Sequence, residues 1–352
     1  MGITAISHKV IRNLIEKTLE LGKQENIHAQ FIHKVTDKSE SLPEGITETS
    51  DSKKVIASLA EGKIAGGTAW LWSEDSSVEA LDYLFVDEAG QMSLSQVLAA
   101  SRAARNLILL GDPQQLEQPQ KGAHPEGSDV AALTYLLDGQ PTISADRGLF
   151  LGITRRMHPA LCTFTSELFY EGRLTSLPGL EQQQLSGGTR YDGAGLFYKL
   201  VSHKGNQSRA DQEVAAIAEM TAELLAKGKY TNAKGETRSL AKEDILIVAP
   251  YNAQVAALTH ALPELRVGTV DKFQGQEAPV VIYSMTASSI EDAPRGMGFL
   301  FNPNRLNVAT SRAKCTCILV ASPRLFEAEC HTIDQMRWAN ALCRYKELAK
   351  EG

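Results

Sequence analysis

Short apolar segments alternate with longer amphipathic segments along most of this chain. Residues 83–86 (YLFV) have the length and apolar content of a strand that is buried on both faces, and residues 106–110 (NLILL) predict another strand. Residues 10–21 instead repeat their apolar positions with helical spacing. Because strands that alternate with helices are typical of parallel sheets with crossover connections, the sequence predicts an α/β fold.

The same reading predicts the remaining elements. We expect further helices at residues 93–104, 158–169, 209–227, 252–262, 303–313 and 332–348. We expect further strands at residues 29–35, 195–201, 244–250, 266–270, 280–285 and 315–321. The alternation therefore runs through both halves of the chain.

Other local patterns give more specific expectations. Residues 36–53 are rich in Ser, Thr, Asp, Glu and Lys, which is typical of a surface loop. Residues 63–72 (KIAGGTAWLW) predict a strand that is interrupted by a Gly-Gly turn. Ser208 with Asp211 resembles a capping box at the start of the next helix. The proline-rich and glycine-rich residues 117–128 predict a loop.

The length and composition predict two globular domains. At 352 residues the chain exceeds the usual size of a single hydrophobic core. Its 43% hydrophobic and 22% charged residues are close to the average of folded proteins. We place the boundary between residues 142 and 147, which gives domains at 1–147 and 148–352.

Composition also argues against several classes of protein. The sequence contains no run of about 18 apolar residues, and MGITAISHKV at the amino terminus lacks the pattern of a signal peptide. We therefore expect a cytoplasmic protein without a membrane segment. The odd number of five cysteines favours reduced thiols over a disulfide framework. A net charge of -6 argues against coating nucleic acid by bulk electrostatics, although a local basic groove remains compatible with it.

An acid pair, Asp87 and Glu88, directly follows the predicted strand at residues 83–86. Open parallel sheets carry their chemistry at the carboxyl ends of strands. The first carboxylate can hold Mg²⁺, and the second can orient and deprotonate an attacking water, as nucleotide hydrolysis requires. Two solvated acids at a strand end are the alternative interpretation, and the pair by itself favours that alternative.

Later segments of the chain carry further candidate residues: Gln115, Arg155, Arg156, Gly275, Glu277 and Arg312. Gln115 follows the predicted strand at 106–110 and could reach a terminal phosphate. Arg312 lies on a predicted helix, where it could face the phosphates. Gly275 would permit the close approach of a ligand, and Glu277 could accept a hydrogen bond from a sugar hydroxyl.

This order of motifs resembles that of superfamily 1 helicases, in the branch of the RNA-surveillance and Okazaki-fragment-processing helicases. VDEAGQ is similar to motif II, GDPQQL to motif III, RRMHP to motif IV, VDKFQGQE to motif V and NVATSRAK to motif VI. TAISHKVI (residues 4–11) is similar to motif Ia, and AGGTAW (residues 65–70) to the next strand-contacting motif. The resemblance covers almost the whole chain, and five motifs in order are not expected by chance.

The resemblance implies two RecA-like domains of the P-loop NTPase type. It also implies an ATP-dependent 5′ to 3′ helicase or translocase that acts on single-stranded nucleic acid, with DNA favoured over RNA. The cofactors would be ATP and Mg²⁺, and the partner would be single-stranded DNA or RNA. The two domains would close on ATP and open after hydrolysis.

The resemblance assigns a role to each matching residue. Asp87 would coordinate Mg²⁺, Glu88 would activate water, and Gln115 would sense the γ-phosphate. Arg156 and Arg312 would act as arginine fingers on the transferred phosphoryl group. The remaining roles are nucleotide contacts by Arg155, Gly275 and Glu277, with Glu277 on the ribose, and nucleic-acid contacts by Ser7, Thr68, Tyr251, Thr269 and Lys272.

The sequence departs from the family pattern in one large respect. No G-x-x-x-x-G-K-[ST] occurs in it, and in the family this phosphate-binding loop precedes the segment similar to TAISHKVI. We therefore expect the first domain to be incomplete at its amino terminus, and this chain alone to hydrolyse ATP weakly or not at all. An upstream P-loop segment would belong to the full-length protein.

Two smaller features bear on the identity of the chain. Arg155 stands where related helicases commonly have a tyrosine that stacks on the base, and a guanidinium plane can also stack. The loop at residues 117–128 is similar to loops of bacterial members, which are often fused behind a nuclease domain. The competing function is a catalytically inactive module that holds nucleic acid or a protein partner.

Overall fold

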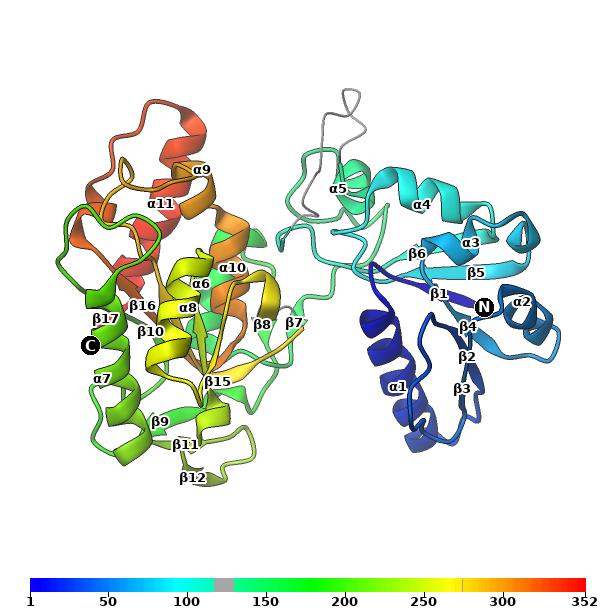
Figure 1. The fold of residues 1–352 in the computed structure, drawn as a ribbon, viewed down its shortest axis with the longest axis horizontal. Helices are drawn as coiled ribbons and strands as arrows, with labels where there is room; N and C mark the ends of the chain where they lie inside the picture. Colours follow the sequence, from blue (N-terminus) through cyan, green and yellow to red (C-terminus); the bar gives the residue numbers. More distant parts are fainter. Residues whose placement is uncertain (117–129, 274) are drawn as a thin grey trace. The chain divides into compact units, whose positions relative to one another are not determined.

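Parallel sheets form the centre of both halves of the chain in the computed structural model (Figure 1). The structure describes residues 1–116, 130–273 and 275–352. These residues form two units, Met1–Gln140 (unit 1) and Pro141–Gly352 (unit 2). The predicted α/β fold with parallel sheets in both halves is confirmed, whereas the predicted boundary at residue 147 stays a prediction. The loop predicted at residues 117–128 lies outside the described residues.

Unit 1 contains a sheet of six parallel strands within its described residues, in the order β3-β2-β4-β1-β5-β6. The strands are β1 (Gly2–Thr4), β2 (Phe31–Lys34), β3 (Ile46–Thr49), β4 (Ile64–Gly66), β5 (Leu81–Val86) and β6 (Ala104–Leu109). The helices are α1 (His8–Gln24), α2 (Ser52–Leu59), α3 (Ala69–Trp72), α4 (Leu94–Ser101) and α5 (Ala132–Leu137). Since β1 and β5 pair with Thr4 opposite Val86, the residues that follow both strands emerge at one sheet edge.

Unit 2 repeats this architecture with a parallel sheet in the order β14-β13-β15-β16-β10-β17. Its strands are β10 (Gly195–Leu200), β13 (Ile245–Val248), β14 (Arg266–Gly268), β15 (Ala278–Ser284), β16 (Ala313–Ala321) and β17 (Lys350–Glu351). Its helices are α6 (Pro159–Phe169), α7 (Asp211–Lys227), α8 (Asn252–Ala261), α9 (Met297–Leu300), α10 (Pro303–Ser311) and α11 (Ile333–Leu348). β15 is buried along its whole length, as expected of a central parallel strand.

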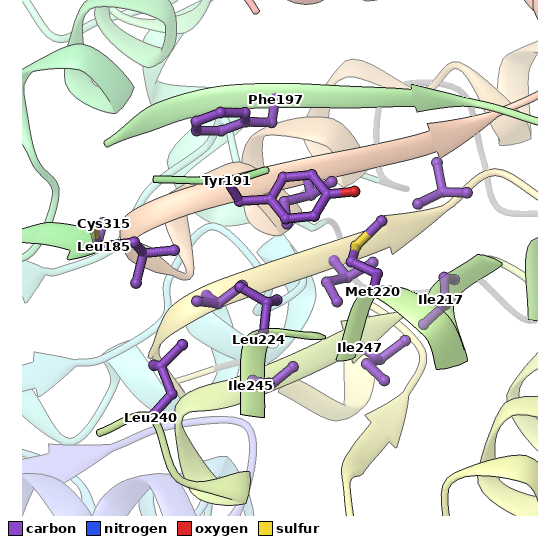
Figure 2. Close-up of a cluster of buried hydrophobic side chains, with 14 of the residues drawn as sticks. Leu185, Tyr191, Phe197, Ile217, Met220, Leu224, Leu240, Ile245, Ile247 and Cys315 are labelled. Carbon is purple, nitrogen blue, oxygen red and sulfur yellow. The ribbon is translucent and has the colours of Figure 1, made fainter. Parts of the chain in front are cut away.

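Two small sheets and an apolar core complete unit 2. β7 (Ile153–Thr154) pairs with β8 (Thr175–Ser176), and β11 (Lys229–Thr231) pairs antiparallel with β9 (Gln184–Ser186) and β12 (Thr237–Ser239). The core in Figure 2 packs side chains of α7, such as Met220 and Leu224, against strand residues such as Ile247. Because these apolar side chains leave water together, they fix α7 on the sheet.

Several local predictions are wrong. Within the predicted loop 36–53, Ile46–Thr49 forms the edge strand β3, because Ile46 is buried in the core of unit 1 and the edge position tolerates polar neighbours. The predicted strand 63–72 ends at Gly66, and Ala69–Trp72 is the helix α3. The bond from the Trp72 indole to the Ile3 carbonyl holds that turn on the sheet.

Two further predictions, the capping box at α7 and the burial of β5 on both faces, are also wrong. The N-cap of α7 is Ala210, without a side-chain cap, so Ser208 and Asp211 form no capping box. Asp211 instead accepts a hydrogen bond from the Arg209 guanidinium. Tyr83 is 45% exposed, so β5 is not buried on both faces at this residue. Within the described residues, no helix is both long and apolar enough to cross a membrane.

Candidate functional site

The acid pair lies at the carboxyl end of β5, beside the end of β1. The Asp87 amide donates to the Thr4 carbonyl at 2.8 Å, and the Asp87 carboxylate accepts from the Glu88 amide at 3.0 Å. Burial raises the pKa of Asp87, and the Glu88 amide only partly opposes that effect. A half-buried carboxylate that is costly to charge by itself suits a cation ligand, because the cation restores the charged form.

Glu88 holds an unusual backbone conformation. Its φ angle is 52°, in the left-handed region that residues other than glycine rarely adopt. The Gln91 side-chain amide donates to the Glu88 carboxylate at 2.9 Å, which helps to orient it. Strained residues of this kind cluster at functional sites, so the conformation agrees with a functional role for the carboxylate. Gln91 is the last residue of VDEAGQ, and the motif alone assigned it no role.

Gln115 lies in the loop that follows β6, the neighbour of β5 in the sheet. Its side-chain amide donates to Asp112 at 2.8 Å, and the Gln114 amide donates to the same carboxylate at 2.9 Å. The turn therefore holds the Gln115 side chain in one orientation at the same sheet edge as the acid pair.

Two glycines allow the loops after β5 and β6 to touch along their backbones. A Cβ atom added at Gly90 would lie 2.7 Å from the Asp112 carbonyl oxygen, and one added at Gly111 would lie 2.9 Å from the Ala89 nitrogen. Neither approach is possible with a side chain, so glycine is required at both positions. The structure thus brings Asp87, Glu88 and the Gln115 loop together.

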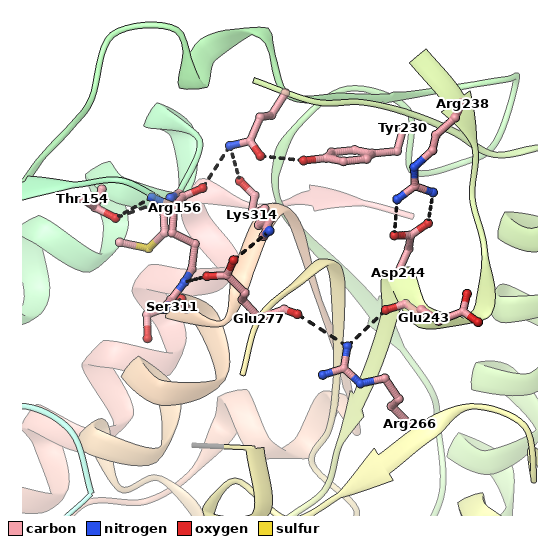
Figure 3. A network of polar contacts seen from close by, with 12 residues as sticks. Thr154, Arg156, Tyr230, Arg238, Glu243, Asp244, Arg266, Glu277, Ser311 and Lys314 are labelled. Carbon is pink, nitrogen blue, oxygen red and sulfur yellow. Dashed lines mark hydrogen bonds and ion pairs between the residues drawn. The ribbon is translucent and has the colours of Figure 1, made fainter. Parts of the chain in front are cut away.

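Unit 2 contains a second polar cluster around Glu277 (Figure 3). Its carboxylate accepts hydrogen bonds from the Arg156 guanidinium and from Lys314, the latter at 2.7 Å. Burial alone would raise the pKa of Glu277, but the bonds from Lys314 and Arg156 outweigh it and the pKa lies below its usual value. Arg156 also donates to the Ser311 carbonyl at 2.9 Å. Residues that are far apart in the sequence therefore share one ion-pair network.

Gln183 joins the segments that carry this cluster. Its side-chain amide donates to the carbonyls of Arg156 at 3.0 Å and Lys314 at 3.2 Å, while the Tyr230 hydroxyl donates to its side-chain oxygen at 2.7 Å. Neither Gln183 nor Tyr230 was predicted, because nothing near them in the sequence marks a contact with such distant segments. Lys314 is the last residue of the motif NVATSRAK, two residues after Arg312. Its place in that motif was the signal that could have identified it.

The other candidates of unit 2 differ in exposure. Arg312 is 4% exposed and is the C-cap of α10, directly after Ser311, whose carbonyl accepts a hydrogen bond from Arg156. Arg155 is exposed. Gly275 has a φ of 73°, and a Cβ atom there would meet no atom of the residues that the structure describes within 4 Å. Arg156, Glu277 and Arg312 thus lie on adjoining segments.

The five candidates for nucleic-acid contact all follow strand ends: Ser7, Thr68, Tyr251, Thr269 and Lys272. Ser7 and Thr68 are the N-caps of α1 and α3, after the neighbouring strands β1 and β4 of unit 1. Tyr251 and Thr269 follow the neighbouring strands β13 and β14 of unit 2. The Lys272 ammonium donates to the Val267 carbonyl at 2.9 Å.

Comparisons with known proteins show to which proteins this chain is similar. The AAA_12 family model, described as "AAA domain", matches residues 139–324. The chain is 29% identical over 281 residues to RNA helicase Mov10l1 of Mus musculus, covering 69% of this chain and 23% of that protein. It is 27% identical over 287 residues to the Regulator of nonsense transcripts 1 homolog of Drosophila melanogaster, covering 75% of this chain and 22% of that protein.

Among solved structures, the chain is similar to Arterivirus nonstructural protein 10 (helicase), at 14% identity and a TM-score of 0.45. The match covers 92% of this chain and 53% of the viral chain. Probable helicase MAGATAMA 3 of Arabidopsis thaliana is a further relative, at 27% identity over 271 residues, which cover 72% of this chain and 32% of that protein. The chain therefore spans about a quarter of the length of the curated relatives named here, from 22% to 32%.

Proposed function

Because the chain belongs to the AAA_12 family of AAA domains, we propose that it is part of an ATP-dependent translocase or helicase. It would move 5′ to 3′ along single-stranded nucleic acid, with DNA favoured over RNA. The observation that carries this proposal is the contact between the acid-pair loop and the Gln115 loop at one sheet edge. Similarity to proteins named as helicases supports it.

The donor atoms around Asp87 fit a magnesium-bound nucleotide. Mg²⁺ prefers carboxylate oxygens, and burial makes the Asp87 carboxylate favour a neighbouring cation. When bound, the ion would neutralise charge on the phosphate oxygens. Asp87 would hold the ion, Glu88 would orient water and take up its proton, and Gln115 would hydrogen-bond to the terminal phosphate.

We infer that Arg156 and Arg312 stabilise the negative charge that develops on the transferred phosphoryl group. Arg155 and Gly275 would contact the nucleotide, and Glu277 its ribose. In the structure, Glu277 already orients Arg156, which supports a positioning role in addition to ribose binding.

Single-stranded nucleic acid would bind through Ser7, Thr68, Tyr251, Thr269 and Lys272. Hydroxyl and ammonium groups at strand ends suit contacts to phosphate and sugar, which position a strand without reading its sequence. Equal affinity for oligonucleotides of different sequence but equal length, measured by fluorescence anisotropy, is the expected result.

We expect this chain alone to release phosphate from Mg-ATP at a rate close to background. Without a G-x-x-x-x-G-K-[ST] in the sequence, the β- and γ-phosphates lack the lysine and backbone amides that usually hold them. The measurement is phosphate release with and without single-stranded DNA or RNA. The Glu88→Gln variant serves as the control for background.

Each result of that experiment has a distinct meaning. Strand-stimulated release that Glu88→Gln abolishes would refute the expected inactivity and support the assignment of Glu88. Oligonucleotide binding without phosphate release would favour the inactive binding module for this chain, or a translocase whose phosphate-binding loop is supplied by another segment. A chain that binds neither nucleotide nor oligonucleotide would contradict the translocase and a nucleic-acid-binding module, and would leave only a module that holds a protein partner.

A further inference from the structure

Aromatic and basic side chains of unit 2 gather where three neighbouring strands end. β14, β13 and β15 are adjacent in the sheet, and the segments after them carry Asp271, Tyr251 and residues 295–305 respectively. Ligands of open parallel sheets bind at this carboxyl edge. The cluster therefore lies where a ligand is expected on topological grounds.

The centre of this cluster is the ring of Phe299 in α9. The guanidinium carbon of Arg295 lies 3.9 Å from the ring centroid, and that of Arg305 lies 4.3 Å from it. The Tyr251 ring packs on the same phenyl group, with its centroid 5.5 Å away. One aromatic ring thus holds two cations close together through cation–π contacts.

The positive charge of the cluster is only partly balanced. Asp271 lies 3.4 Å from the Arg305 guanidinium, farther than in a close charge-assisted hydrogen bond. Arg295 makes no ion pair with any residue that the structure describes. The nearby acids have other contacts, because Glu291 lies 3.8 Å from Arg324 and Asp292 accepts from Ser289. Two like charges held side by side repel each other, and a bound anion would remove that repulsion.

Two buried hydroxyl groups, those of Tyr251 and Tyr283, lie beside the cations. Tyr251 is 7% exposed and Tyr283 is 2% exposed, and neither hydroxyl has a hydrogen-bond partner among residues 1–116, 130–273 and 275–352. Burial raises the pKa of Tyr251, while Arg295 and Arg305 are near enough to oppose that effect. Buried hydroxyl groups without partners are uncommon, and these two lie close to the positive charge of the arginines.

We propose that Arg295 and Arg305, held on Phe299 and flanked by Tyr251, bind a backbone phosphate of single-stranded nucleic acid. This inference rests on the proposed function and adds a contact outside the residues that the motifs supplied. Arginine binds phosphate with geometric specificity, and a partly exposed aromatic ring beside it offers a surface for an adjacent base. The site is therefore indifferent to base identity.

The test is the fluorescence anisotropy of labelled oligodeoxythymidine and oligouridine between about 50 and 200 mM salt. Over this range, affinity that depends on phosphate contacts falls steeply. We expect Arg295→Gln and Arg305→Gln each to weaken binding about tenfold and to lower the salt slope by about one. DNA and RNA should be affected equally, because both present the phosphate. Phe299→Leu should weaken binding as well, since it removes the ring that places both arginines.

Two controls separate a phosphate contact from a structural role. Lys346→Gln removes a comparable cation, 4.7 Å from the Phe326 ring, and should leave affinity and salt slope unchanged. Asp271→Asn should tighten binding severalfold, because it removes a negative charge beside the proposed phosphate. Inorganic phosphate at millimolar concentration should not displace the oligonucleotide, which distinguishes a strand from a free anion.

Unchanged affinity and salt slope in both arginine variants, with the wild type binding normally, would overturn this inference alone. Equal weakening by Lys346→Gln would also overturn it, because the effect would then be nonspecific. Failure of the wild type to bind either oligonucleotide would overturn the proposed function together with the inference.

Discussion

Replacing Glu213 by alanine should lower the free energy of unfolding of unit 2 by about 3–5 kcal/mol, because the substitution removes the shared acceptor of a buried hydrogen-bond network. The Glu213 side chain is fully buried. It accepts hydrogen bonds from the Ser284 hydroxyl at 2.5 Å and the Thr286 amide at 2.9 Å, and it lies 3.1 Å from His203. The substitution leaves these groups buried without their acceptor. Hydrogen exchange of the β15 amides measures the loss.

A matched control comes from the same helix. Glu219 also lies on α7, but it is 74% exposed and pairs with Arg190 at the surface. Because exposed ion pairs contribute little, Glu219→Ala should change protection by at most about 1 kcal/mol. Equal loss of protection in the two variants would show that the buried network does not stabilise the sheet.

The stability of unit 1 should fall by about 3 kcal/mol as the pH drops from 7 toward 4, through one histidine. His33 is 1% exposed, and burial, with His8 nearby, lowers its pKa from the usual 6.5 to about 4. Between these values the unfolded chain binds a proton that the folded chain does not. Stability is therefore complete above pH 6.5 and is lost as the pH falls through this window.

Urea unfolding at several pH values measures this effect. Trp72 is buried in unit 1 and reports its unfolding in a chain that carries Trp70→Phe and Trp338→Phe. His33→Gln should remove most of the change in the free energy of unfolding between pH 6.5 and 4, whereas substitution of the exposed His28 should not. Glu48 has a lowered pKa and contributes in the same sense, but only near and below its own usual value of 4.5. A slope that persists in His33→Gln would contradict the assignment.

The strand and helix order could be predicted because it depends on local apolar periodicity. That signal is strong in β15 and α1, which are long and have clear apolar faces. It is weak in β3, where an edge position tolerates polar residues, and in α3, whose four residues follow two glycines. The capping box failed because α7 begins at Asp211, later than its sequence suggests.

The candidate residues could be predicted from the sequence because they lie in short motifs. Their hydrogen-bond partners in the fold could not be predicted in this way. Gln183 contacts Arg156 and Lys314 through backbone carbonyls that any residue could provide. The Phe299 cluster likewise depends on strand order, since β14, β13 and β15 become neighbours only in the sheet. Contacts that arise from topology leave little trace in one sequence.

The backbone contact at Gly90 and Gly111 implies that the two loops of unit 1 move as one body. A displacement of the Glu88 backbone would push directly on the turn that carries Gln115. If phosphate loss relaxes the strained Glu88 residue, the same displacement reports that loss to the neighbouring loop. The close backbone contact at these two glycines would then couple the roles proposed for Glu88 and Gln115 mechanically.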